Sequence, residues 1–390
     1  MVSRFLVIAL IALVSFAASA DDRYCENGLI AVDARHAGGD LDGCRFKSGD
    51  SVELTFRPED RSVDNDFSWF SFRVTAKKPQ KIKIRMRFPD GYARFWPKIS
   101  HDGKSWTPAA EAAVRRNWSK KSMTLIVTAG ESATWVSAQE LLTQSYYDQW
   151  LEELAAHQDI LTAEIGKSVE GRPVTLVKTS NKREAIVLLG RQHPTEVPGA
   201  LAMRVFVDAL LADTVLAKEF RERFTLLIVP LVNPDGVENG HSRHNAGGTD
   251  LNRDWGPFTQ PETQSIAGLL EAVDKLKMTP RLMLDFHATK YTDSLLFYTQ
   301  LTEDETDPPN FATNWLYSVR SRLPDFAFVH DPRPTSEQPN TKGYFYTRYG
   351  IPSFTYELGD EADRESIRAS TPIFAEEMMR VMLQADLPGT

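Results

Sequence analysis

Two residues that could bind a metal, His193 and Glu196, follow directly on the apolar run 185–190. At a strand-to-helix junction, side chains three positions apart can turn toward one point. Imidazole nitrogen and carboxylate oxygen are both zinc ligands, and a catalytic zinc site has three protein ligands plus a water. His287 is the best candidate for the third ligand, because it ends another apolar run, 281–287. The sequence therefore predicts one Zn²⁺ ion per chain, bound by His193, Glu196 and His287.

These residues also have ordinary structural interpretations. A His-x-x-Glu pair is a weak signal, since an exposed pair at a helix start arises by chance. His287 could be a hydrogen-bonded histidine at a strand end, and His241 and His244, in a glycine-rich loop, could compete with it. Asp285 lies two residues before His287 on the same predicted strand face and could orient the ring.

Glu357 ends the apolar run 353–357. A carboxylate at the end of a hydrophobic strand is unfavourable unless it is paired or has a function. Beside a zinc-bound water it would act as the general base that takes the proton when the water attacks. The structural alternative is an ion pair with a nearby Arg or Lys.

The elements that must position these residues are strands alternating with helices after about residue 160. Continuous apolar strands between helices indicate an α/β fold with a sheet covered on both faces. Ligands of such folds bind at the strand ends, where the candidate residues lie. We expect helices near 137–157, 197–216, 261–276, 310–323 and 361–384.

Residues 21–138 are predicted to form a separate antiparallel β-sandwich domain, and 139–388 the catalytic domain. Several short runs alternate polar and apolar residues, as half-buried strands do. They lie at 51–56, 71–74, 81–88 and 122–128. Turn signals separate them, and short strands at this spacing are typical of a sandwich.

Residues 1–20 have the pattern of a secretory signal peptide. Arg4 precedes an apolar run, and the small residues 18–20 form a cleavage site. The run is shorter than the ~20 residues of a membrane anchor. We expect cleavage after Ala20 and a periplasmic or secreted protein. Cys25 and Cys44 could pair in such a compartment, but the sequence leaves the pairing open.

The composition is that of a globular protein, with 42% hydrophobic and 25% charged residues and a formal net charge of −8. The negative charge argues against nucleic-acid binding, since the basic runs, such as Lys77-Lys78 and Lys120-Lys121, are short. We interpret them as solvated turns. No nucleic acid is expected as a partner, nor a membrane beyond the cleaved signal, and the oligomeric state stays open.

The motif set resembles the zinc carboxypeptidase family typified by carboxypeptidase A. It runs in order through His193-x-x-Glu196, Asn233-Pro-Asp-Gly, Asp250-Leu-Asn252-Arg253-x-Trp255, His287 and Glu357. The loop Gly240-x-x-Arg243 and a β-rich preceding domain resemble the cytosolic carboxypeptidase type. The combined motif set is specific, although each piece alone is not.

The resemblance implies an α/β fold with a mixed, carboxypeptidase-like sheet covered by helices on both faces. It also implies a peptide substrate with a free C-terminus and a role for each matching residue. Arg243 would stabilise the oxyanion, Asn252 and Arg253 would bind the terminal carboxylate, and Asp250 would contact His193. Lys342 matches the position that lines the side-chain pocket and would favour an acidic terminus such as glutamate. An exposed loop lysine is the alternative at that position. No tyrosine can be assigned the role of the family's mobile tyrosine, because Thr335 and Ser336 stand near its expected place.

The expected activity is therefore that of a zinc metallocarboxypeptidase. Two other functions fit the same residues. A zinc amidase would act on cell-wall peptides, whose stems carry free carboxylates. A non-catalytic pseudo-peptidase would capture C-terminal tails, and replacing Glu357 by Gln separates it from an enzyme.

Overall fold

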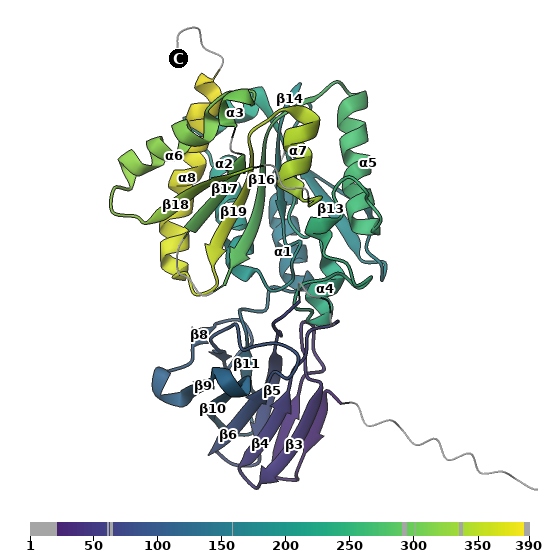
Figure 1. The fold of residues 1–390 in the computed structure, drawn as a ribbon, viewed down its shortest axis with the longest axis vertical. Helices are drawn as coiled ribbons and strands as arrows, with labels where there is room; N and C mark the ends of the chain where they lie inside the picture. The colour runs from purple at the N-terminus through teal and green to yellow at the C-terminus, as the bar shows by residue number, and fades with distance from the viewer. Residues whose placement is uncertain are drawn as a thin grey trace, which may run out of the picture.

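The computed structural model describes residues 22–60, 62, 65–157, 159–290, 295–300, 302–334 and 338–385. The predicted signal peptide, and Thr335 and Ser336, lie outside the described residues. Two stacked parts are visible in Figure 1, a β-rich N-terminal domain and a larger α/β domain. Within the described residues, no helix has both the length and the apolar character needed to cross a bilayer.

The N-terminal domain consists of two sheets packed face to face. One has the order β1-β2-β5-β11-β7-β8, and the other β3-β4-β6-β10-β9. The strands of the first sheet are β1 (Tyr24–Glu26), β2 (Ile30–Asp33), β5 (Ser71–Ala76), β7 (Lys98–Ser100), β8 (Thr107–Pro108) and β11 (Thr134–Ser137). Those of the second are β3 (Gly43–Ser48), β4 (Ser51–Thr55), β6 (Gln80–Arg87), β9 (Val114–Asn117) and β10 (Ser122–Ala129).

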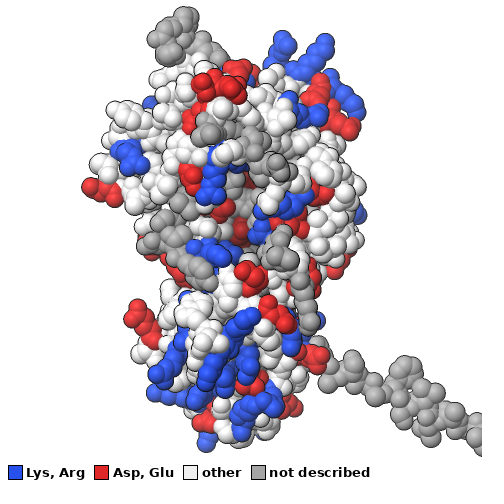
Figure 2. Space-filling view, in the orientation of Figure 1, with Lys and Arg blue, Asp and Glu red and all other residues white. Residues whose placement is uncertain are grey.

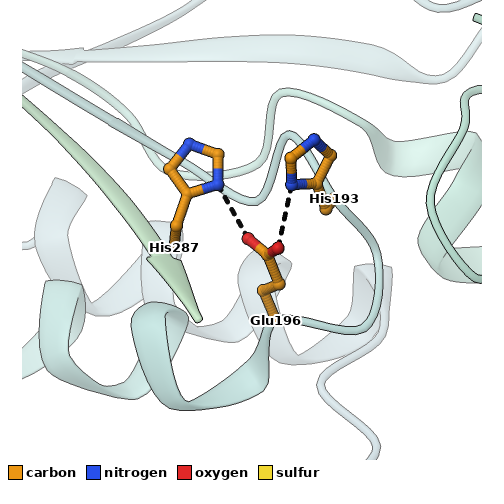
Figure 3. Close-up of side chains that lie close together, drawn as sticks. All are labelled: His193, Glu196 and His287. Atoms are coloured by element: carbon orange, nitrogen blue, oxygen red, sulfur yellow. Dashed lines mark hydrogen bonds and ion pairs between the residues drawn. The ribbon is translucent and has the colours of Figure 1, made fainter. Parts of the chain in front are cut away.

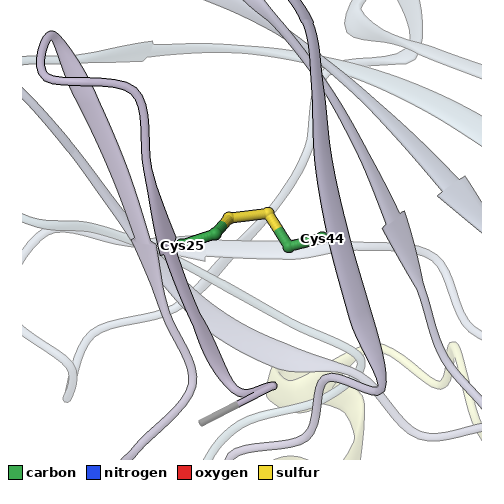
Figure 4. Close-up of a disulfide and its surroundings, with 2 residues drawn as sticks. All are labelled: Cys25 and Cys44. Atoms are coloured by element: carbon green, nitrogen blue, oxygen red, sulfur yellow. A yellow bond between two sulfur atoms is a disulfide. The ribbon is translucent and has the colours of Figure 1, made fainter. Parts of the chain in front are cut away.

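Alternation along the strands explains this packing. On β6, Ile82, Ile84 and Met86 are fully buried between the sheets, while the residues between them are exposed. The predicted sandwich is confirmed, with one difference, since β4 pairs with β6 in parallel. A disulfide joins Cys25 on β1 to Cys44 on β3 and so links the two sheets (Figure 4).

The α/β domain contains an eight-stranded mixed sheet of order β12-β13-β15-β14-β16-β19-β17-β18. Its strands are β12 (Leu161–Lys167), β13 (Pro173–Lys178), β14 (Glu184–Gly190), β15 (Phe224–Val229), β16 (Thr279–Thr289), β17 (Leu295–Gln300), β18 (Phe328–Arg333) and β19 (Ser353–Gly359). Its helices are α1 (Gln144–Ala155), α2 (Val197–Leu211), α3 (Val215–Arg223), α4 (Pro234–Asn239), α5 (Pro261–Lys275), α6 (Phe311–Arg322), α7 (Thr341–Tyr349) and α8 (Arg364–Gln384).

Both faces of this sheet are covered, which confirms the predicted fold class. On β14, Ile186 and Leu188 belong to the core beneath α2 and α8, whereas Val187 and Leu189 belong to the core beneath α5 and α7. A strand that is buried on both faces has a continuous apolar sequence, so polar and apolar residues do not alternate along β14.

Some predicted elements were wrong in extent. The helix expected at 197–216 is two helices, because Thr214 caps the start of α3 by accepting a hydrogen bond from the Ala217 N–H. The helix expected from 137 begins only at Gln144, after β11 ends at Ser137. The short helices α4 and α7 and the strands β12, β13 and β18 were not predicted.

The exposed face of the β3-β4-β6-β10-β9 sheet is strongly basic. Lys81, Lys83, Arg85 and Arg87 alternate with the core residues of β6 and point outward. Figure 2 shows Lys and Arg side chains gathered over this domain. The sequence shows only short basic runs, because this surface is built from alternate residues of several strands.

Candidate metal and catalytic site

The predicted metal ligands His193 and Glu196 meet at the turn between β14 and α2. The Nδ1 atom of His193 lies 2.9 Å from Glu196 Oε1 (Figure 3). Glu196 is the residue immediately before α2, and the chain turns sharply there. The strand end and the helix start therefore bring the two side chains together, as their spacing predicts.

His287 joins them from β16, a neighbour of β14 in the sheet. Its Nδ1 atom lies 2.8 Å from Glu196 Oε2, so both rings direct the same nitrogen at one carboxylate (Figure 3). Gly199, in the first turn of α2, allows this approach: a Cβ added there would lie 2.5 Å from the His287 carbonyl oxygen. Neither His241 nor His244 belongs to this group.

Each histidine ring is held from behind by an aspartate. Asp250 Oδ1 lies 3.0 Å from His193 Nε2, and Asp285 Oδ2 lies 2.8 Å from His287 Nε2. Such contacts fix which ring nitrogen faces a metal and increase its basicity. Gln192, which was not predicted, donates to Asp285 Oδ2 at 2.6 Å and so supports this arrangement.

This group fits a zinc ion. The ligand atoms of His193, Glu196 and His287 all lie within 4.8 Å of one another, and the three residues are buried. Two neutral imidazole nitrogens and one carboxylate are a common ligand set of catalytic zinc, with a position left for water. Without a cation, the buried negative charge of a carboxylate between two imidazoles would be stable only if a ring were protonated. The ligand chemistry therefore suits a divalent metal.

Glu357 lies next to this group. It is the register partner of His287 on the parallel strands β16 and β19, so the two side chains leave the sheet on the same side. Burial raises the pKa of Glu357 to about 7, and the negative charge of Glu196 adds to the effect. In the described part of the chain, no ion pair is recorded for this carboxylate and its Oε2 atom has no hydrogen-bond partner. The alternative of a structural ion pair is not observed there.

Arg243 belongs to the same network through Asp250. Its Nε and Nη2 atoms lie 2.9 and 2.7 Å from Asp250 Oδ2, while the other oxygen of Asp250 faces His193. The predicted contact between Asp250 and His193 is thus present, and it links the arginine to a metal ligand. The remaining guanidinium nitrogen of Arg243, Nη1, takes part in neither of these contacts with Asp250.

Asn252 and Arg253 lie in a short 3₁₀ helix, Leu251–Arg253, which Asp250 caps. The amide nitrogen of Asn252 is 3.4 Å from His287 Nε2, and its oxygen accepts hydrogen bonds from Thr341. Arg253 donates to the Asn252 carbonyl oxygen at 2.8 Å. Both residues therefore lie beside the metal group, and Asn252 also fixes the start of α7.

Lys342 lies in the first turn of α7 and is only 8% exposed. Its Nζ atom donates to the Thr299 carbonyl oxygen at 2.8 Å. Burial lowers the pKa of Lys342 to about 8, and the nearby Arg333 guanidinium adds to the effect. The alternative of an exposed loop lysine is therefore wrong.

The N-terminal domain contributes residues that sequence reasoning missed. Arg94 forms a bidentate ion pair with Asp360, at 2.7 and 3.0 Å, and donates to the Ala288 carbonyl oxygen at 3.3 Å. Ala288 directly follows His287 near the end of β16, and Asp360 directly follows the end of β19, three residues after Glu357. No local pattern around Arg94 distinguishes it from a surface arginine.

Comparison with known proteins decides the family. The pattern described as zinc carboxypeptidase matches residues 147–373, which is more than half of the chain. This chain belongs to the zinc carboxypeptidase family. A second pattern, described as the cytosolic carboxypeptidase N-terminal domain, matches residues 32–138 of this zinc carboxypeptidase. The predicted resemblance is confirmed for both parts of the chain.

Relatives of this zinc carboxypeptidase are distant. It is 24% identical over 216 residues to an uncharacterised protein of Zymomonas mobilis, covering 54% of this chain and 56% of that one. It is 30% identical over 165 residues to cytosolic carboxypeptidase 4 of Homo sapiens, covering 38% and 14% of the two chains. The chain thus spans about half of the first relative and a small part of the second.

Solved structures share the fold of this zinc carboxypeptidase over most of its length. A metallo-carboxypeptidase from Burkholderia cenocepacia superimposes with a TM-score of 0.75 at 20% identity, covering 91% of this chain and 98% of that one. A metallo-carboxypeptidase from Pseudomonas aeruginosa gives a TM-score of 0.73 at 17% identity. At such identities the likeness concerns the fold.

Proposed function

We propose that this enzyme removes C-terminal residues from peptides with one zinc ion bound by His193, Glu196 and His287. The observation that carries the proposal is the buried His-Glu-His group with Glu357 in register beside it. When bound, zinc would polarise the scissile carbonyl and acidify the attacking water. The residues of the chain then account for the remaining steps.

Glu357 would act as the base. It takes a proton from the attacking water as the water oxygen bonds to the carbonyl carbon, and it delivers that proton to the leaving amine as the C–N bond breaks. Its place in register with His287, beside the metal group, puts this carboxylate where both transfers occur. Arg243 would stabilise the negative charge that develops on the carbonyl oxygen.

The substrate's free carboxylate would bind to Asn252 and Arg253, and its terminal side chain would face Lys342. The buried ammonium group of Lys342 makes this part of the site positively charged, and that charge complements an acidic side chain. Acidic terminal residues such as glutamate are therefore the proposed preference. Equal turnover of peptides ending in Glu, Lys and Phe would remove this part of the proposal.

The proposed location is the periplasm or the exterior, with cleavage after Ala20. Several relatives are named cytosolic carboxypeptidases, so cell fractionation with N-terminal sequencing is needed. An exported protein that begins at Asp21 is expected. A protein retained in the cytosol with Met1 in place would contradict the proposal.

The activity is tested by digesting a peptide library with the full chain and reading the products by mass spectrometry, with and without a chelator. Loss of single C-terminal residues that stops with the chelator is expected. Cleavage confined to amide bonds of cell-wall peptides would favour the zinc amidase. Binding of C-terminal tails with no cleavage of any peptide would favour the pseudo-peptidase.

A further inference from the structure

A carboxylate of the N-terminal domain holds the loop that carries Arg243. Glu59, just after β4, accepts hydrogen bonds from three consecutive backbone N–H groups of the α/β domain. Its Oε2 accepts from Ser242 at 2.7 Å, and its Oε1 accepts from Arg243 at 2.9 Å and from His244 at 2.5 Å. Hydrogen bonds to an ionised acceptor are among the strongest in proteins.

Neighbouring contacts fix the same loop from both sides. From the N-terminal domain, the Trp69 N–H donates to Ser242 Oγ at 2.9 Å, and Asp60 pairs with His244 Nδ1. From the α/β domain, Thr195 Oγ1 donates to the Ser242 carbonyl oxygen at 3.1 Å. Thr195 lies between the two metal ligands of its turn. The loop therefore connects the N-terminal domain to the metal group.

We infer that Glu59 is a positioning residue that sets the place of the Arg243 guanidinium relative to the scissile carbonyl. The inference rests on the proposed function, in which Arg243 stabilises the oxyanion. Asp250 fixes only the end of the Arg243 side chain, whereas Glu59 fixes its backbone. The N-terminal domain would then be part of the catalytic apparatus, although it contributes no atom to the reaction.

The E59Q variant is the first test, because it keeps the shape of the side chain and replaces one acceptor oxygen by an N–H₂ group that faces a backbone donor. We expect kcat/KM to fall by about 10- to 100-fold, mostly through kcat, since a displacement of about 1 Å costs on the order of 100-fold. Zinc content should not change, whereas the melting temperature should fall, because a backbone donor loses its acceptor. The control is E111Q, which alters an exposed glutamate of the same domain.

A double-mutant cycle separates positioning from general damage. If Glu59 acts through Arg243, then E59Q has no further effect in the R243A background. Multiplication of the two losses, or an unchanged kcat/KM in E59Q alone, would overturn the inference. E59D, which shortens the reach, provides a second variant if E59Q folds poorly.

Hydrogen exchange provides a readout that does not need activity. The amides of residues 242–244 should exchange faster in E59Q than in the wild type or E111Q, and unchanged protection would overturn the anchoring. If the wild type cleaved no peptide, the proposed function would fail while this measurement still decided the role of Glu59 in holding the loop.

A separate observation concerns the basic sheet face, the exposed side of the β3-β4-β6-β10-β9 sheet. Strand register places Arg45, Glu53, Arg85, Thr124 and Arg115 in one row across the five strands. Glu53 is the carboxylate of that row, and it lies 3.0 Å from Arg45, 3.7 Å from Arg85 and 3.4 Å from Lys47. The face thus already binds one carboxylate between several cations.

The geometry points to an acidic peptide segment as the ligand of the basic sheet face, bound as Glu53 is bound. Lys81, Lys83 and Arg87 extend the cationic surface along β6, at the spacing of alternate residues of an extended strand. Nucleic acid fits less well, because the uncharged β10 positions of the face are Thr124, Ile126 and Thr128, which cannot stack on bases.

Fluorescence anisotropy of a labelled deca-glutamate peptide with an amidated C-terminus tests this surface, since the amide removes the terminal carboxylate. We expect K83E/R85E to weaken binding at low salt by about tenfold or more. K104E/K167E, with the same charge change at exposed lysines elsewhere, should not. Unchanged binding by K83E/R85E, or tighter binding of single-stranded DNA or anionic vesicles than of the peptide, would overturn the proposal.

Discussion

His287 and Glu357 face each other across the parallel strands β16 and β19, as register partners in the centre of the α/β sheet. One contributes a nitrogen to the metal group, and the other presents a carboxylate whose pKa is raised to about 7 by burial. Strand pairing alone therefore places the base next to the metal. The positions of the two groups depend on the sheet and not on a flexible loop.

Replacing His287 by Ala should abolish zinc binding. Two remaining ligands cannot complete a site that needs three protein ligands. Metal analysis of the purified protein should give about one zinc per wild-type chain and less than about a tenth of that for H287A. H101A, which alters an exposed histidine of the N-terminal domain, should retain the metal. Full zinc content in H287A would contradict the ligand assignment.

Replacing Glu357 by Gln should lower kcat by about 10²- to 10⁴-fold, the usual contribution of a general base. The amide keeps the shape of the side chain but cannot accept the proton of the attacking water. Zinc content should stay at one per chain, and steady-state kinetics on a peptide with a free C-terminus measures the loss. Retention of more than a tenth of the wild-type rate would exclude Glu357 as the base.

Binding of acidic termini should depend on pH through Lys342. Because burial lowers the pKa of this lysine to about 8, its ammonium form predominates below pH 8 and is lost above it. KM for a peptide ending in glutamate should therefore rise as the pH increases through 8. K342M should remove this dependence and raise KM at pH 7, while peptides ending in Phe are unaffected. A flat pH profile for the wild type would contradict the role of Lys342.

Removing Arg94 should weaken the attachment of the two domains. Its ion pair with Asp360 is almost fully buried, so R94A leaves an unpaired carboxylate and should lower the free energy of unfolding by about 3–5 kcal/mol. Chemical denaturation followed by tryptophan fluorescence measures the change. R35A, which breaks an exposed ion pair in the same domain, should cost less than about 1 kcal/mol. Equal losses of unfolding free energy in R94A and R35A would show that the Arg94–Asp360 ion pair does not stabilise the protein.

The metal group could be predicted because its members end apolar strand-like runs or follow them directly. His193, Glu196 and His287 are recognisable by residue type at such positions, and Asp285 by its spacing from His287. Glu59 and Arg94 could not be predicted, since their partners lie 184 and 266 positions away in the chain. Contacts between domains leave no local pattern in the sequence.

Helix α7 shows a different limit. Its sequence, Thr341 to Tyr349, contains one glycine, two threonines and four aromatic residues, all of low helix propensity. The usable signal was Asn340, which caps the helix by accepting a hydrogen bond from the Gly343 N–H. Because the helix was missed, the burial of Lys342 could not be deduced. The basic sheet face could not be predicted, because its residues come from strands that pair only in the folded sheet.

Anomalous scattering at the zinc absorption edge, from crystals of the full chain, tests the central claim most directly. The account predicts one strong peak about 2.0–2.2 Å from His193 Nδ1, His287 Nδ1 and a Glu196 oxygen. The cluster of Glu59, Asp60 and His244 also brings possible ligand atoms together. A peak at that cluster, with none between His193, Glu196 and His287 in zinc-loaded protein, would contradict the account.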